Sequence, residues 1–207
     1  MSTLSPAASR ARILRLCETA LLTAIIVLMA FTPLGYLRMP GLEISFIQIP
    51  VAVGAILLGP GTGLFLGAVF GITSFFQCFG FSAFGAALLV INPWLTAVVC
   101  LVPRVLMGWL CGLLFRALSR VDKTRLLSFG AASLSAALLN TVFFTAAVLL
   151  LFGSTDYIHQ LQQTLGATGI LTFVVAFVGL NGLVEAIVCT VVGTAVSKAL
   201  SVWLKKL

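Results

Sequence analysis

A few polar side chains interrupt the long apolar runs of this sequence, and they are the residues that could do chemistry. A polar group in hydrocarbon costs free energy unless it is paired, so each one is a candidate functional residue. The candidates are Gln77, Arg104, Asn140, Asn181 and Glu185, the last two being one helical turn apart. Amide, guanidinium and carboxyl groups suit the binding of a small polar molecule. For the three amides, the alternative is hydrogen bonding between helices.

Arg104 directly follows Pro103. A helix that begins at this proline would place the guanidinium beside free backbone N–H groups. That combination favours a carboxylate or a phosphate as ligand. In the alternative, Arg104 pairs with Glu185 or Glu43, or extends to the membrane interface.

Aromatic residues gather in the same part of the chain. They could wall an apolar pocket, although an interfacial aromatic belt needs no ligand. The residues are Phe75, Phe76, Phe79, Phe81, Phe84 and Trp94.

Motifs of enzymes are absent from the sequence. There is no HExxH, no GxSxG, and no GxxxxGK[ST] loop for ATP. The five cysteines form no CxxC pair, so we predict neither a metal site nor a cofactor. If ATP drives this protein, other subunits must hydrolyse it, and the chain itself is not expected to be an enzyme.

Composition explains which elements position these residues. Of the 207 residues, 61% are hydrophobic and only 8% are charged, which is far too little charge to cover a soluble domain. Apolar runs of about 20 residues, long enough to span a bilayer as helices, recur along the chain. We therefore predict an all-α membrane protein that forms a single domain over residues 1–207.

Basic residues predict the topology. They fall in three groups between apolar runs: Arg10, Arg12 and Arg15; Arg116, Arg120, Lys123 and Arg125; Lys198, Lys205 and Lys206. Short loops rich in Lys and Arg stay in the cytoplasm. If an even number of helices separates each basic group from the next, all three groups and both termini lie on the cytoplasmic side. The net charge of +7 thus reflects topology in the cell membrane rather than nucleic-acid binding.

Six transmembrane helices account for this pattern. We expect them at about residues 16–31, 46–58, 62–79, 103–118, 126–152 and 170–200. External loops would occupy 33–45 and 153–168, and 80–102 would partly re-enter the membrane. In an alternative interpretation, the fourth helix begins at Trp94 and is kinked at Pro103. For the first apolar run, the alternative is a signal peptide.

Glycines recur every fourth residue in the third predicted helix, at Gly63, Gly67 and Gly71. Small residues at this spacing let another helix approach closely. We interpret them as a packing surface.

Two segments carry a family resemblance. IQIPVAVGAILLGPGTGLFLGAVFG at 47–71 and INPWLTAVVCLVPRVLMGWLCG at 91–112, with the Ala20-x-x-x-Ala24 step, resemble the S components of energy-coupling factor (ECF) transporters. These are small vitamin-capturing membrane proteins with six helices. The second segment is similar to the pantothenate-type branch. The resemblance covers nearly the whole chain.

The resemblance implies partners and a site. Ala20 and Ala24 would dock on the transmembrane T component, and two partner ATPases would supply power. Substrate would lie in the outer half, and the protein would topple to release it inward. Pantothenate would use Arg104 for its carboxylate, amides for its hydroxyls and amide, and phenylalanines for its methyls. The implied substrate contacts are Gln77, Phe76, Asn92, Arg104, Asn140, Asn181 and Glu185.

Other functions stay open at this point. The same scaffold serves folate, cobalamin and other vitamins. An autonomous secondary transporter would show inverted repeats, and none is convincing here. A membrane subunit without a ligand is the remaining alternative.

Overall fold

The computed structural model describes residues 6–39, 42–122, 126–164, 166 and 169–204. Helices dominate it, and a short antiparallel hairpin is inserted after the first helix. In chain order the elements are α1 (Pro6–Ala30), β1 (Tyr36–Met39), β2 (Leu42–Ser45), α2 (Gln48–Leu58), α3 (Pro60–Gln77), α4 (Ala83–Ile91), α5 (Pro93–Leu118), α6 (Leu126–Phe152), α7 (Asp156–Thr164) and α8 (Ile170–Leu204).

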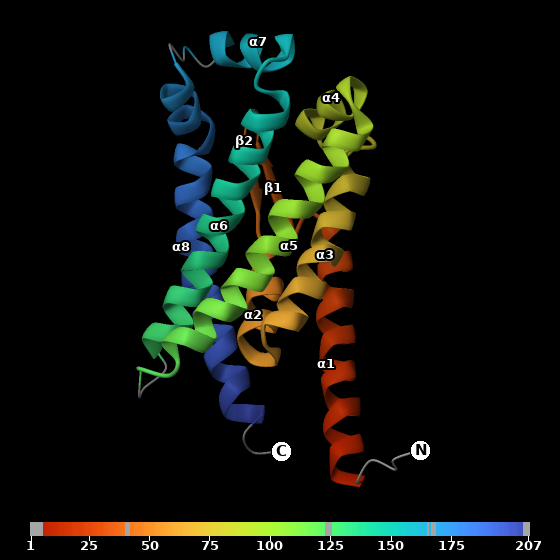
Figure 1. Ribbon diagram of the computed structural model, residues 1–207, viewed down its shortest axis with the longest axis vertical. Helices are drawn as coiled ribbons and strands as arrows, with labels where there is room; N and C mark the ends of the chain where they lie inside the picture. The colour runs from red at the N-terminus through yellow and green to blue at the C-terminus, as the bar shows by residue number, and fades with distance from the viewer. Residues whose placement is uncertain (1–5, 40–41, 123–125, 165, 167–168, 205–207) are drawn as a thin grey trace.

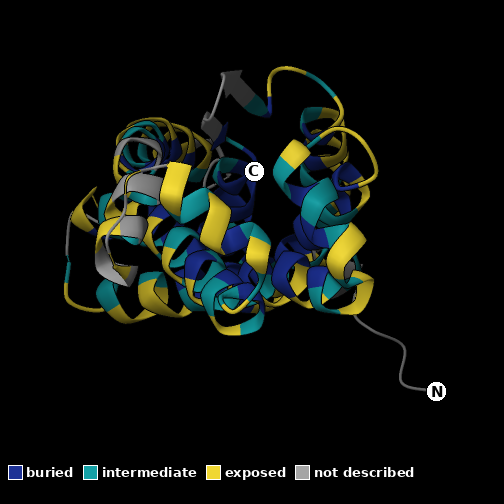
Figure 2. Cartoon of the chain, turned by 90° about the horizontal axis from the view of Figure 1, so that it is seen from above, coloured by how far each residue is buried: buried dark blue, intermediate teal, exposed yellow. Residues whose placement is uncertain are grey.

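The long helices run roughly side by side between two ends of the molecule (Figure 1). Both ends of the chain lie at the lower end in that view, whereas α4 and α7 lie at the upper end. Seen from above, buried residues line the inner faces of the helices and exposed residues cover the outside (Figure 2). This arrangement agrees with an even number of passes along the bundle.

Within the part of the chain that the structure describes, four helical stretches are long and apolar enough to cross a membrane: Arg12–Ala30, Pro93–Leu118, Leu126–Phe152 and Gly182–Val202. The apolar helix α2 is shorter, with 11 residues. Many large apolar side chains on the outside are exposed, among them Leu21, Val142 and Leu150. The bundle thus presents an apolar surface, as expected of a protein whose solvent is lipid. The prediction of six crossings remains a prediction.

The glycines of α3 form the predicted packing surface, and the structure confirms it. A Cβ atom added at Gly63 would lie 2.2 Å from the carbonyl oxygen of Gly108, and one at Gly67 would lie 2.3 Å from that of Arg104. Only glycine fits at such distances. The backbones of α3 and α5 therefore touch directly, which places the Arg104 turn at a defined position.

Residues 80–102 differ from the expected re-entrant segment. They form α4 and the first part of α5, so the alternative start near Trp94 was the better one and a start at Pro103 was wrong. The side chain of Asn92 caps α5 by accepting hydrogen bonds from the N–H groups of Trp94 at 3.1 Å and Leu95 at 3.2 Å. Pro93 occupies the first turn, where its missing N–H costs nothing.

Both predicted external loops contain secondary structure. Within 33–45, β1 pairs with β2, and the register places Arg38 opposite Glu43 and Tyr36 opposite Ser45. Within 153–168, α7 buries Ile158 in the core while most of its polar residues are exposed. α1 also begins ten residues earlier than expected, at Pro6 rather than Leu16. The hairpin, α7 and the start of α1 lie in polar stretches of the sequence. Such stretches do not show the apolar pattern of a transmembrane helix, so the sequence did not predict these elements.

Candidate functional site

A cavity of about 510 Å³ lies between the helices, and its lining extends from the middle of α5, α6 and α8 to α4 and α7. Figure 1 shows α4 and α7 at the end of the bundle opposite the start of α1 and the end of α8. Ligand pockets for small molecules typically have the size of this cavity. Its described lining comes from the hairpin and from α3 to α8. The lining residues are Tyr36, Ser45, Ser74, Gln77, Cys78, Ser82, Ala83, Phe84, Gly85, Leu88, Thr96, Val99, Cys100, Arg104, Asn140, Thr141, Phe144, Thr145, Tyr157, Leu161, Val178, Gly182 and Glu185.

Arg104 lies inside helix α5, not at its start, and its side chain is only 7% exposed. Its Nη1 donates a hydrogen bond to the carbonyl oxygen of Val99 at 2.8 Å. The guanidinium carbon lies 4.3 Å from the ring centroid of Phe144 and 5.6 Å from that of Phe70. Nε has no hydrogen-bond partner among the described residues. The helix N-terminus invoked from the sequence is therefore absent, and two aromatic faces flank the cation instead.

Glu185 of α8 faces the cavity and holds the hairpin in place. Its Oε1 accepts a hydrogen bond from the backbone N–H of Ser45 at 2.7 Å, and its Oε2 accepts one from Nε2 of Gln48 at 3.3 Å. The carboxyl group thus connects α8 with the end of β2 and the first turn of α2. Its second role, toward a ligand, stays a prediction.

Two predicted amides also reach the cavity. Gln77 is buried at the C-terminal end of α3, and its Nε2 donates to the carbonyl oxygen of Ala30 at the end of α1. Asn140 is 6% exposed in α6, and its Oδ1 has no partner among the described residues. Asn140 Oδ1 is therefore an unsatisfied acceptor in a residue that lines the cavity, while the amide N–H of Gln77 connects α3 with α1.

Apolar and aromatic side chains complete the wall. Phe84 of α4 contacts Phe144 of α6 with ring centroids 6.3 Å apart and Tyr157 of α7 at 6.1 Å. Leu88 and Val99 are almost fully buried beside them. The cavity thus combines polar groups and a buried cation with apolar and aromatic walls.

The hairpin supplies residues that sequence reasoning missed. Tyr36 and Ser45 face each other across the two strands and both line the cavity. Burial raises the pKa of the Tyr36 phenol, so it stays a neutral hydroxyl at physiological pH. Phe144 and Tyr157 were missed as well. Tyr36 and Ser45 lie in strands of only four residues, which are too short to show an alternation of inward and outward side chains in the sequence.

The comparison with known protein families decides what kind of molecule carries this cavity. Residues 14–197 match the model of the family described as "ECF transporter, substrate-specific component". The chain belongs to this family. It is thus an S component, a transport protein, and the expectation drawn from residues 47–71 and 91–112 is confirmed.

Two relatives of this S component carry names that state a substrate. The chain is 30% identical over 167 residues to the pantothenic acid transporter PanT of Lactococcus lactis subsp. cremoris, covering 76% of this chain and 77% of the relative. It is 33% identical over 131 residues to the pantothenate transporter PanT of Leuconostoc mesenteroides, covering 60% and 62% of the two chains.

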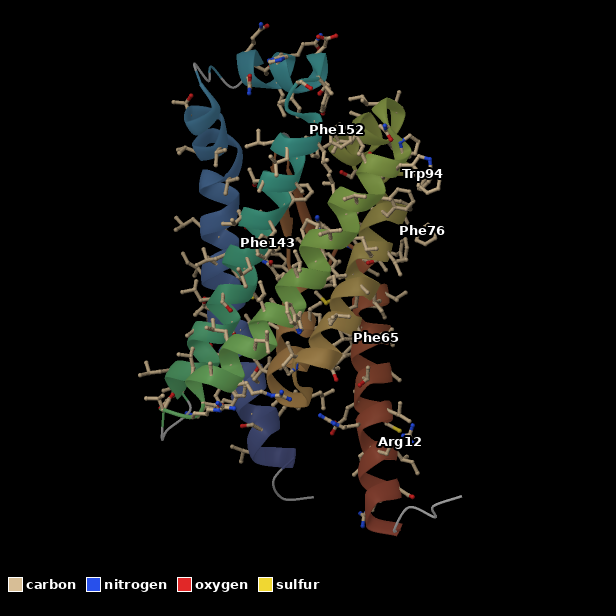
Figure 3. The ribbon with its side chains drawn as sticks, in the orientation of Figure 1. Arg12, Phe65, Phe76, Trp94, Phe143 and Phe152 are labelled. Carbon is tan, nitrogen blue, oxygen red and sulfur yellow. The ribbon has the colours of Figure 1, made fainter. Side chains whose placement is uncertain are left out.

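Two predicted substrate contacts, Phe76 and Asn92, do not line the cavity of this S component. Phe76 is 55% exposed and points away from the bundle, on the same side as Trp94 in the view of Figure 3. Asn92 does not line the cavity, because its side chain caps α5. The side chain of Asn181 lies outside what the structure describes, as does that of Glu43.

The predicted docking residues of the S component lie on the outside of α1. Ala20 and Ala24 are both exposed, and they line a mostly apolar groove together with Thr19, Thr23 and Phe65. The two threonine hydroxyls donate to carbonyl oxygens one turn earlier in the helix, at 2.8 Å each. The groove therefore offers small and internally satisfied side chains to a partner helix in lipid.

Proposed function

We propose that this S component captures pantothenate in the cavity around Arg104 and delivers it to the cytoplasm. The buried guanidinium with an unpartnered Nε is the observation that carries the proposal. A charged side chain this deep in an apolar bundle is expensive unless a counter-charge is supplied. The carboxylate of pantothenate supplies one, and the names of both relatives point to the same vitamin.

The rest of the cavity matches the remainder of the molecule. Pantothenate has two hydroxyls, an amide and a gem-dimethyl group besides its carboxylate. Asn140 Oδ1 can accept from a hydroxyl or the amide N–H, and Glu185 can accept from a second hydroxyl. Phe84 and Phe144 can pack against the methyl groups. Asn181 remains a candidate on α8.

Orientation and partners complete the proposal. The basic residues Arg12, Arg15, Arg116 and Lys198 lie toward the end of the bundle that holds the termini, as Arg12 illustrates (Figure 3). The positive-inside rule makes this end cytoplasmic, so the cavity lies in the outer half of six membrane crossings. Ala20 and Ala24 dock on a T component, and two partner ATPases drive release.

Binding to purified protein tests the substrate. Wild-type protein is titrated with pantothenate and with a panel of other vitamins that includes folate and cobalamin. We expect saturable binding of pantothenate that the others do not displace. Arg104→Ala should weaken binding by about tenfold or more, because a charge-assisted hydrogen bond contributes about 1.5–3 kcal/mol. Arg116→Ala, on the exposed surface of the same helix, is the matched control.

Pantothenol, in which an alcohol replaces the carboxylate, sharpens the assignment. If Arg104 binds the carboxylate, Arg104→Ala weakens pantothenate binding much more than pantothenol binding. Equal losses for both ligands would place Arg104 in a structural role. Absence of saturable pantothenate binding to wild-type protein would reject the substrate altogether.

A further inference from the structure

Two cysteines face each other in the wall of the cavity. Cys78 follows the last residue of α3, and Cys100 lies in α5. Their sulfur atoms are 3.8 Å apart, and both residues line the cavity. Both are nearly buried, with 4% and 5% exposed. No other role assigned above uses this pair.

Helix packing produces this proximity. The glycine surface of α3 continues to Gly71, where an added Cβ would lie 2.8 Å from Cα of Leu101 and 3.0 Å from the carbonyl oxygen of Cys100. The last turns of α3 are therefore pressed against α5. On the other side, an added Cβ at Gly85 would lie 2.7 Å from Sγ of Cys78. Glycines thus keep two sulfur atoms close together in a crowded place.

The remaining cysteines serve as internal comparisons. Cys111 and Cys189 are also buried, but neither lines the cavity. Each donates to a carbonyl oxygen of α6, that of Ala132 or Ser133, at 3.3 Å. Cys17 is exposed on α1. Among the described residues, Cys78 and Cys100 are therefore the pair that is both mutually adjacent and next to the ligand space.

We propose that Cys78 and Cys100 form an oxidisable dithiol whose disulfide closes the binding cavity. A small peroxide is the oxidant. One sulfur, as thiolate, attacks a peroxide oxygen, and the O–O bond breaks to leave a sulfenic acid and one water or alcohol. The second sulfur then attacks the first and displaces water. Both thiol protons leave in the two released molecules, and the two electrons have passed to the peroxide.

The structural change required is small. The sulfur atoms must approach from 3.8 Å to about 2.05 Å, a movement that side-chain rotation and a slight helix shift can provide. The new bond lies between the segments that bear two polar lining residues, because Cys78 follows Gln77 and Cys100 precedes Arg104 by one turn. The backbones of α3 and α5 already touch here, so the bond does not draw the helices together; it shifts the adjacent side chains of Gln77 and Arg104 and so narrows the cavity. The effect on pantothenate binding rests on the proposed function.

Peptide mapping tests the chemistry without any ligand. Protein with Cys17→Ser, which removes intermolecular disulfides, is treated with hydrogen peroxide, alkylated and digested without reductant. We expect a peptide pair joined through Cys78 and Cys100, which dithiothreitol separates, while Cys111 and Cys189 remain thiols. The proposal would be overturned if disulfides formed only between other cysteines. It would also be overturned if the joined pair of peptides were absent after all the peroxide had reacted.

Binding measurements test the consequence. Oxidation should weaken pantothenate binding by the wild-type protein at least tenfold, with recovery on reduction. Cys100→Ser and Cys78→Ser, each compared with its own untreated protein, should keep their affinity after peroxide treatment. A joined pair with unchanged affinity would refute the closure. If peroxide treatment also weakens binding by Cys100→Ser, the loss of affinity comes from oxidation at other residues, and the proposed closure is refuted as well. If reduced wild-type protein does not bind pantothenate, the proposed substrate is wrong. Peptide mapping then still tests whether Cys78 and Cys100 form a disulfide.

Discussion

Arg104 donates a hydrogen bond from Nη1 to the carbonyl oxygen of Val99 at 2.8 Å, and Pro103 explains why that oxygen is free. In a regular helix the N–H of residue 103 would donate to this carbonyl, but proline has no N–H. The arginine that follows the proline therefore repairs the helix and is itself fixed in the cavity. One irregularity in α5 thus both removes a backbone hydrogen bond and orients the buried cation that we propose as the carboxylate site.

Pro103→Ala should test this relationship. The alanine N–H can donate to Val99, so α5 becomes regular and Arg104 loses its anchor. We expect thermal stability in detergent to be unchanged or raised, while pantothenate binding weakens about tenfold. Pro60→Ala, at the first turn of α3, is the control and should change neither quantity. An affinity equal to that of the wild type would show that the anchor is unnecessary.

Glu185→Ala should destabilise the protein. It leaves the Ser45 N–H and the Gln48 amide without their acceptors, at about 1–3 kcal/mol each. A decrease in the temperature of unfolding in detergent measures this loss. Glu185→Gln keeps an acceptor for Ser45 and should lose less, and Glu18→Ala on α1 should lose little. If Ala and Gln variants unfold at the wild-type temperature, Glu185 does not hold the hairpin.

Gly67→Ala should separate α3 from α5. The new Cβ would lie 2.3 Å from the carbonyl oxygen of Arg104, so the helices must move apart, at about 1–3 kcal/mol. We expect both a lower unfolding temperature and weaker pantothenate binding, since Arg104 moves with its backbone. Gly61→Ala, in the first turn of the same helix, meets nothing within 4 Å and is the matched control. Normal behaviour of Gly67→Ala would argue against direct backbone contact.

Ala20→Trp and Ala24→Trp should abolish assembly without affecting ligand binding. Both alanines are exposed, so the larger side chains disturb no internal packing and instead occupy the groove on α1. Co-purification of the T component and ATPases from membranes measures assembly, and pantothenate titration measures binding. Ala146→Trp, on the exposed side of α6, should preserve both. If both variants still co-purify with intact complexes, the docking surface must lie elsewhere on the protein.

Sequence reasoning identified the family and the charged and amide residues of the described cavity lining. Gln77, Arg104, Asn140 and Glu185 stand out because each is a costly group within an apolar run, and all four line the cavity. Phe76 and Asn92 do not. An apolar run shows no difference between its lipid-facing and its inward-facing aromatic residues, since both surroundings are apolar. An asparagine before a proline suits a helix cap as well as a ligand contact.

By itself, the sequence determined that the chain is a membrane protein of the ECF substrate-specific component family, with a few polar residues available for a ligand. Composition, basic groups and motifs are local properties, and they suffice for this. Only the tertiary structure decided that Tyr36 and Ser45 of a hairpin reach the cavity, that Arg104 lies in mid-helix, and that Cys78 meets Cys100. These results depend on which helix faces pack together, and the close approach of glycine surfaces, rather than hydropathy, determines that.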